Sequence, residues 1–382
     1  MPNNILSILL ILFSILLAFG KLDPIFSLES SVNTIDVVIV TFLVAFFITR
    51  FNDFLKSIFS KNFLYIFLIF FLFVFAQILN GYSVLVKPLY NLKFVMCGVF
   101  FVSLISIFKK SPLTIHHCLI AFSVSSFIYS IFVLFISPDL YQIVKGQMIV
   151  LDENPNSTSS RLAIAIIYIL YFVIQNPLKW GRKRLVFLLL VPSLAAMVVM
   201  SGSRGSLLAV LLGAYLIFIF SDINKIKKIV LSIFSFFCSL FLFKFLLSSD
   251  DLGGRWEKAL GGDTAGRTDI WEAVLKITYA KPLGVGETGY VENITNLYGM
   301  YIDTHNIFLY ILVCGGWLSL IFFIMFLISI FKNSFSCYMD DREILPLIFL
   351  FIMLFIAAKT GGVITFLLFW FILAVVASYR KI

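Results

Sequence analysis

The chain has 382 residues, of which 61% are hydrophobic and only 13% are charged, and its mean hydropathy is +1.05. A soluble protein of this length needs far more charged surface than this composition supplies, so we expect a polytopic membrane protein. The five cysteines are scattered singly without C-x-x-C spacing, which favours neither disulfides nor a metal site.

Apolar runs recur along the whole sequence, and each is long enough for a helical membrane span. The hydrocarbon core of a bilayer is about 30 Å thick and takes about 20 helical residues to cross. Backbone polar groups in lipid must be satisfied within the segment, so we expect an all-α fold with about twelve spans in one transmembrane domain over residues 1–382. The predicted spans lie near residues 4–20, 34–50, 62–80, 89–108, 114–137, 161–176, 185–201, 204–221, 229–247, 304–331, 344–358 and 362–379.

The distribution of positive charge predicts the orientation of the chain. If the N-terminus is cytoplasmic, every connection on that side is short and basic, as the positive-inside rule requires. We therefore expect both termini in the cytoplasm, and the net charge of +9 indicates topology and not a nucleic-acid partner. The basic residues of these connections are Arg50, Lys56, Lys61, Lys109, Lys110, Lys179, Arg182, Lys183, Arg184, Lys225, Lys227, Lys228, Lys332, Arg342, Arg380 and Lys381.

The longest polar interval is predicted to be a large external loop over residues 248–303, between the ninth and tenth spans. It contains Arg255 and Arg267, and His305 follows where the chain turns apolar again. Arg161, before the sixth predicted span, and Arg204, in the turn SGSRGS, are predicted to lie on the same side. A guanidinium at a membrane boundary is costly unless it reaches water or meets an anion, so this side is the predicted place for chemistry.

Each of these residues also has an ordinary structural interpretation. Arg161 and Arg204 can be anchors that extend to the membrane surface, and Arg267 can pair with a neighbouring aspartate of the loop. His305 can simply adjoin a helix cap, held by Asp303. Against this, a helix N-terminus flanked by glycine and serine, with an arginine beside it, suits a phosphate or pyrophosphate group.

Three sequence blocks carry a resemblance to a known family. They read SGSRGSLLAVLLG, then GRTDIWEAVLKI followed by PLGVG, and finally THNIFLYILVCGG, within roughly residues 150–330. Together and in this order they resemble the signature blocks of the O-antigen polymerase (Wzy) and O-antigen ligase (WaaL) superfamily of integral-membrane glycosyltransferases. The resemblance implies a type-C glycosyltransferase-like helical fold in the bacterial cytoplasmic membrane, with an active site facing the periplasm and no metal ion or cofactor.

The resemblance also implies substrates and roles. The donor would be an oligosaccharide linked through pyrophosphate to undecaprenol, within membrane lipid, and a chain-length regulator protein is a candidate partner. Arg204 and Arg267 would hold the pyrophosphate, with Arg161 and Arg255 as supporting cations. His305 would accept the proton of the attacking sugar hydroxyl, next to Asn306 in the family's His-Asn pair, and single displacement would invert the anomeric carbon.

Three functions stay open at this point. GRTDIW followed by PLGVG looks more like polymerases, which join lipid-linked repeat units. A ligase would transfer the finished glycan to the lipid A core from the same donor. A flippase of lipid-linked sugar would also have many helices, but transporters bind near the bilayer midplane and often contain inverted repeats, and neither pattern is evident here.

Overall fold

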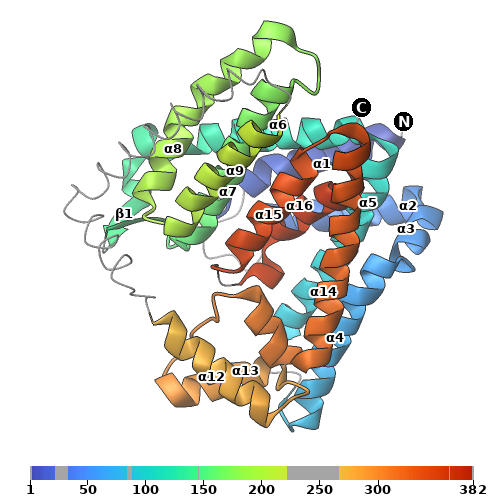
Figure 1. Cartoon of the computed structure of the whole chain (residues 1–382), viewed down its shortest axis with the longest axis vertical. Helices are drawn as coiled ribbons and strands as arrows, with labels where there is room; N and C mark the ends of the chain where they lie inside the picture. The colour runs from blue at the N-terminus through green and yellow to red at the C-terminus, as the bar shows by residue number, and fades with distance from the viewer. Residues whose placement is uncertain are drawn as a thin grey trace.

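The computed structural model describes residues 2–21, 33–83, 88–144, 146–221, 266–360 and 362–380 (Figure 1). Most of these residues are helical. The α-helices of the first half are α1 (Pro2–Phe19), α2 (Thr34–Thr49), α3 (Phe51–Ile58), α4 (Lys61–Leu79), α5 (Pro88–Lys110), α6 (Pro112–Ile131) and α7 (Pro155–Gln175). Those of the second half are α8 (Val191–Met200), α9 (Arg204–Phe220), α12 (Arg267–Ala280), α13 (Gly286–Tyr298), α14 (Ile307–Asp341), α15 (Leu345–Ala357) and α16 (Leu367–Ser378).

Shorter elements join some of these helices. A π-helical turn η1 (Phe132–Ile136) extends α6, and 3-10 segments form η2 (Pro138–Leu140), η3 (Gly181–Leu190) and η4 (Val363–Thr365). Strands β1 (Tyr141–Val144) and β2 (Gln147–Val150) pair antiparallel, with Tyr141 opposite Val150. This hairpin lies before α7 and was not predicted from the sequence.

The described helices confirm a multi-pass membrane protein. Five of them are long and apolar enough to cross a membrane, and the bent pair of α2 and α3 would make a sixth. The shorter apolar helices α9, α15 and α16 coincide with predicted spans but fall below 18 residues. The total of about twelve spans stays a prediction, and the predicted span at 229–247 lies outside the described residues.

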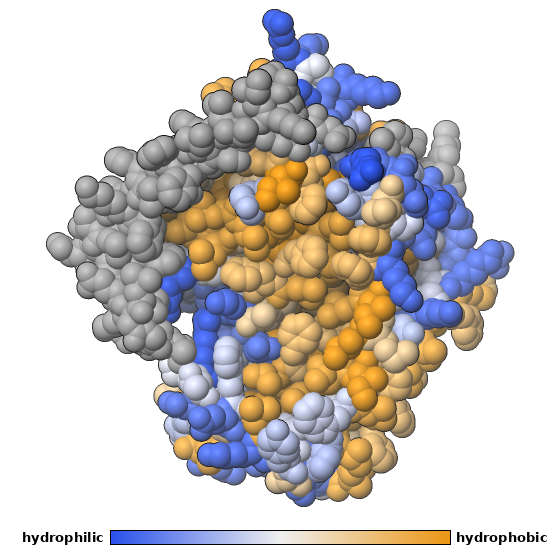
Figure 2. All heavy atoms as spheres, viewed as in Figure 1, coloured by the Kyte–Doolittle hydropathy of each residue, from blue (hydrophilic) through white to orange (hydrophobic). Residues whose placement is uncertain are grey.

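Long helices pack side by side around buried interior helices. α14 lies along α4, α1 along α6, and α16 against α5 (Figure 1). In α14, Phe323 and Phe326 are buried, whereas Ile321, Ile324 and Ile328 are exposed. Figure 2 shows a broad apolar area in the middle of this face, with polar atoms toward the ends. An apolar surface of this extent is suited to contact lipid.

The predicted external loop is partly helical. Its described part contains α12 and α13, which lie at one end of the bundle, away from the two chain termini (Figure 1). α13 is fixed to the end of α4, because Gln77 Nε2 donates to Thr288 Oγ1 at 3.0 Å and Asn80 Nδ2 donates to the Gly284 carbonyl at 3.0 Å. We call this end of the bundle the α13 end.

A backbone joint connects the α12–α13 turn to a kink in α14. Gly316 interrupts the helix with φ 72° and ψ −174°, and Trp317 N donates to the Pro282 carbonyl at 3.2 Å. On the other side, Val285 N donates to the Val313 carbonyl at 2.9 Å. A Cβ atom on Gly316 would lie 2.3 Å from the Pro282 oxygen. The backbones of the PLGVG motif (residues 282–286) and of the CGG motif (residues 314–316) therefore contact each other. We call this contact the glycine joint.

Candidate active site

Arg204 is the first residue of α9, and a serine cluster fixes the turn before it. Ser203 Oγ accepts from Ser206 N at 3.5 Å and donates to Asn156 Oδ1 at 2.8 Å. Ser206 Oγ in turn accepts from Ser159 Oγ at 2.8 Å. The turn SGSRGS is therefore bound to the first turns of α7, so the start of α9 has a fixed position relative to α7.

Arg267 is the first residue of α12, and the same helix is tied to the segment before α14. Trp271 lies one turn further along α12, on the face that Arg267 shares. Its indole Nε1 donates to the Thr304 carbonyl at 2.9 Å. The GRTDIW motif thus combines a cation with an anchor, and the anchor brings Arg267 close to His305.

His305 is held in an uncommon backbone conformation at the entrance to α14. Its φ is +50°, in the left-handed region where a residue with a side chain costs about 1–3 kcal/mol. Asp303 Oδ1 accepts from His305 N at 2.7 Å, and Asp303 Oδ2 accepts from Gly362 N at 3.0 Å. Asn306 Oδ1 caps α14 by accepting from Phe308 N and Leu309 N. The surrounding hydrogen bonds therefore fix the backbone of His305.

Arg267 lies close enough to both His305 and Arg204 for an electrostatic interaction with each. Burial lowers the pKa of the His305 imidazole, and of two nearby charges the Asp303 carboxylate raises this pKa while the Arg267 guanidinium lowers it. Burial and the charge of Arg204 lower the pKa of Arg267. The starts of α9, α12 and α14 thus bring together Arg204, Arg267 and His305. In the described part of the chain, His305 Nδ1 is buried without a hydrogen-bond partner.

Arg161 has a different environment from the one predicted. Because α7 already begins at Pro155, Arg161 lies inside the helix and not at its N-terminus, and its exposed fraction is 3%. Its Nη1 and Nη2 donate to the two carboxylate oxygens of Glu153 at 2.5 and 2.6 Å. A Cβ atom on Gly20 would lie 2.2 Å from Nη2, so backbone closes over the pair. For Arg161 to bind substrate, its guanidinium would therefore have to contact the substrate and the Glu153 carboxylate at the same time.

The structure describes only one of the other two predicted binding residues, Arg255 and Asn306. Arg255 lies outside the described residues. Asn306 uses Oδ1 as the cap of α14 and also lines a cavity beside His305.

That cavity lies between α13, the segment before α14, and the connection between α15 and α16. It opens to solvent, and about 540 Å³ of space that protein atoms do not fill lies within it, solvent included. Glu287 contributes a buried carboxylate whose Oε1 accepts from Tyr310 Oη at 2.8 Å. The lining residues are Glu287, Tyr301, Asp303, Thr304, Asn306, Ile307, Tyr310, Thr360, Gly362, Val363, Ile364 and Thr365.

Sequence reasoning did not identify the cavity or the Glu153 partner of Arg161. One usable signal was TGGVIT at residues 360–365, a short polar break between two apolar runs. Another was Glu287, an acidic residue directly after PLGVG. Neither signal shows by itself that the connection between α15 and α16 reaches the segment before α14.

The fold and this cluster define a class of protein: a multi-pass helical membrane protein with two arginines and a histidine gathered at the α13 end. Residues 185–324 match the family model described as O-antigen ligase (Wzy_C). The chain therefore carries a domain of this family, which Wzy polymerases and WaaL ligases share, and the resemblance seen in the sequence is confirmed. No curated protein matches the chain. The matched residues include Arg204, Arg267 and His305.

Proposed function

We propose that the protein is an O-antigen polymerase, which joins undecaprenyl-pyrophosphate-linked repeat units by inverting glycosyl transfer on the periplasmic side of the membrane. The family acts on lipid-linked glycans, and this substrate class supplies the donor. The observation that carries the proposal is the convergence of Arg204, Arg267 and His305 from three separate helix starts. Two cations and a neutral imidazole are the groups that displacement of a pyrophosphate by a hydroxyl requires.

In the proposed reaction, the acceptor hydroxyl oxygen attacks the anomeric carbon of the donor from the face opposite the pyrophosphate. The new glycosidic bond forms as the bond from this carbon to the pyrophosphate oxygen breaks, so the configuration inverts. The electron pair leaves with undecaprenyl pyrophosphate, and Arg204 and Arg267 stabilise the charge that develops on its oxygens. The hydroxyl proton goes to His305, which later releases it to water.

The environment of His305 supports its role as the base. A base must be neutral before it can accept a proton, and the lowered pKa keeps the imidazole neutral at pH 7. The nearby Arg267 guanidinium also makes protonation before the substrate arrives less favourable. The backbone hydrogen bond to Asp303 fixes the position of the residue without using either ring nitrogen.

We further propose that the cavity beside His305 binds the acceptor sugar. Its polar lining includes the carboxylates of Glu287 and Asp303, which accept hydrogen bonds from sugar hydroxyls, and the ring of Tyr301. Asp303, Thr304 and Asn306, which flank His305 in the sequence, form one wall of the cavity, so the proposed acceptor site adjoins the segment that carries the imidazole. Glu287→Gln should raise the acceptor KM several-fold and leave the donor KM unchanged, since a neutral amide accepts hydrogen bonds less strongly.

The arginine clamp can be tested by substitutions that keep the charge. Lysine cannot form the two parallel hydrogen bonds of a guanidinium, so Arg204→Lys and Arg267→Lys should each lose at least tenfold in polymerisation of purified lipid-linked repeat units. Arg182→Lys, on an exposed residue of η3, is the matched control and should keep full activity. Full activity in both clamp variants would refute the proposed roles of these two arginines.

The base can be tested by comparing two variants of His305. A general base contributes typically 10²–10⁴-fold, so His305→Ala should lose polymer formation while retaining binding of the lipid-linked donor. His305→Gln should fail equally, because an amide donates and accepts hydrogen bonds but cannot take up the proton. Polymer formation by His305→Gln near the parent rate would show that His305 only orients the substrate.

A ligase function is the second candidate, because the matching family model carries that description. Supplying the purified protein with lipid-linked repeat units alone, and then with lipid A core, distinguishes the two reactions. A polymerase builds a ladder of chain lengths in the first reaction, whereas a ligase forms product only in the second. A flippase would change no chain length in either, and the position of the cluster at one end of the bundle argues against it.

A further inference from the structure

A second polar site lies at the corner between α2 and α3, far from the α13 end. The two helices meet at an angle of 110°, and Arg50 is the residue between them. α4 begins close after this corner at Lys61 and reaches α13 at its other end through Gln77 and Asn80. At 1.5 Å per residue, the length of α4 separates the two sites by about 28 Å.

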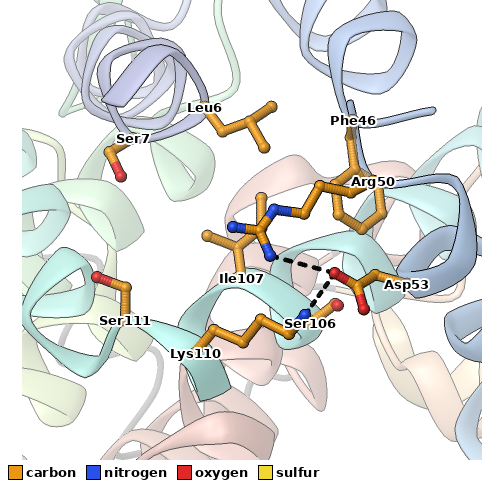
Figure 3. A pocket seen from close by; sticks show the side chains of 9 residues that line it. All are labelled: Leu6, Ser7, Phe46, Arg50, Asp53, Ser106, Ile107, Lys110 and Ser111. Carbon is orange, nitrogen blue, oxygen red and sulfur yellow. Dashed lines mark hydrogen bonds and ion pairs between the residues drawn. The ribbon is translucent and has the colours of Figure 1, made fainter. Parts of the chain in front are cut away.

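At this corner, α1, α2, α3 and α5 surround a small hollow that opens to solvent (Figure 3). One side of the wall is apolar, and the rest is charged or carries hydroxyl groups. The lining residues are Leu6, Ser7, Phe46, Arg50, Asp53, Ser106, Ile107, Lys110 and Ser111.

The charges around the hollow do not balance. Asp53 Oδ2 accepts from both Arg50 Nη1, at 3.3 Å, and Lys110 Nζ, at 2.5 Å. Two cations therefore share one carboxylate, which leaves one excess positive charge. Figure 3 shows the other side of the Arg50 guanidinium turned toward the open space between Ser7 and Ser111. Within the described residues, Arg50 Nη1 has a hydrogen-bond partner, whereas Arg50 Nε and Nη2 have none.

The hydroxyl groups of the wall also have hydrogen atoms available. In the part of the chain that the structure describes, the side chains of Ser7 and Ser106 have no hydrogen-bond partner. Ser111 Oγ accepts from Thr114 Oγ1 at 2.9 Å and keeps its own hydrogen free to donate. The unused groups around the hollow are thus donors, which suits a ligand that is rich in acceptor oxygens and negatively charged.

The surroundings of the hollow indicate a lipid. α3 is a short helix at a large angle to α2; it exposes Phe51 and Lys56, and Phe59 directly after it is also exposed. Helices of this composition lie in the boundary between headgroups and acyl chains. The buried side chains of Leu6 and Phe46 close the apolar side of the hollow. An anion held here would carry an apolar part.

We propose that this hollow binds the phosphate of an anionic phospholipid headgroup in the leaflet opposite the α13 end. Arg50 and Lys110 would contact the phosphate oxygens, and Ser7, Ser106 and Ser111 would donate to the oxygens that remain. The acyl chains would lie beside α3, where Phe51 is exposed. The excess positive charge favours a lipid with net negative charge over a zwitterionic one.

The test uses the full-length protein purified in detergent, with phosphatidylglycerol as the probe. Bound lipid is counted by native mass spectrometry across a titration, next to the same titration with phosphatidylcholine. We expect at least tenfold weaker binding of phosphatidylglycerol to Arg50→Gln, because a charge-assisted contact is lost. Lys56→Gln removes the same charge from exposed α3 outside the hollow and should bind as the parent does.

A second variant distinguishes loss of the binding site from misfolding of the protein. Ser7→Val keeps every charge and fills part of the hollow, so it should also weaken binding several-fold while melting at the parent temperature. Equal phosphatidylglycerol binding by the parent, Arg50→Gln and Ser7→Val would overturn the proposal. Competition by inorganic phosphate at concentrations equal to the lipid would show a site for free phosphate instead, and equal binding of phosphatidylcholine would refute selection for an anionic headgroup.

Discussion

Replacing Gly316 with alanine should open the glycine joint and free the α12–α13 unit from α14. The backbone at Gly316, with φ 72° and ψ −174°, lies in a region that is essentially restricted to glycine. In addition, the new Cβ would lie 2.3 Å from the Pro282 oxygen and 2.5 Å from the Leu283 carbonyl carbon. Both atoms belong to the backbone, so the contact cannot be relieved by a side-chain rotation.

The expected cost follows from these contacts. Strain of this kind costs about 1–3 kcal/mol. Moving the Pro282–Val285 segment away breaks the bonds from Trp317 N and Val285 N, each worth about 1 kcal/mol. The total of about 3–5 kcal/mol corresponds to a local opening equilibrium that is more favourable by a factor of roughly 10² to several 10³.

Hydrogen exchange measured by mass spectrometry reports this opening directly. Peptides that contain Val285 and Trp317 should exchange much faster in Gly316→Ala, and transfer activity should fall because α12 carries Arg267. Gly299→Ala is the matched control, since Gly299 has φ +75° but no atom within 4 Å of its added Cβ. Equal exchange in the two variants would show that positive φ alone, and not the close approach of the two backbones, accounts for the effect.

Three further outcomes are expected. In the proposed mechanism His305 is a neutral base with a lowered pKa, so activity should persist at pH 7 and fall as the pH drops through that pKa. Arg267→Gln should move this fall on the acidic side of the pH–rate profile to higher pH in the residual activity, because it removes a charge that lowers the pKa of His305. Asp303→Asn should move the fall to lower pH, and a pH–rate profile that does not move in either variant would argue against His305 as the base. Arg161→Gln should destabilise the protein by about 3–5 kcal/mol, because Glu153 is left buried without its partner, and the double variant with Glu153→Gln should recover part of this loss in thermal unfolding.

The sequence predicted the helical membrane fold because lipid imposes a simple rule of length and hydropathy. It located α4 and α6 well, whereas it began the span of α7 at residue 161 and the helix begins at Pro155. It ended the tenth predicted span at residue 331, whereas α14 continues to Asp341, because hydropathy does not show where a helix continues into polar sequence. The same limit made α12 and α13 look like loop, since their mixed composition hides regular helices.

The proximity of Arg204, Arg267 and His305 was predictable from local sequence, and their catalytic roles stay a prediction. Arg204, Arg267 and His305 each stand at the end of a polar interval, and the structure brings them together. The roles of Glu153 and Gly316 depend on contacts that a linear pattern does not contain. Nothing in the sequence indicates that Glu153 pairs with Arg161. The need for glycine at position 316 follows only from the close approach of the Pro282 carbonyl.

The buried pair of Glu153 and Arg161 bears on how the protein enters the membrane. A lone arginine in a helix costs about 2.5–3.5 kcal/mol at the centre of the bilayer during insertion. Here the compensating carboxylate precedes the arginine by eight residues, so both charges belong to the same nascent segment. The charge of Arg161 is therefore offset from its own segment before α9 and α12 have been synthesised, so entry of α7 into lipid needs no later carboxylate for this charge.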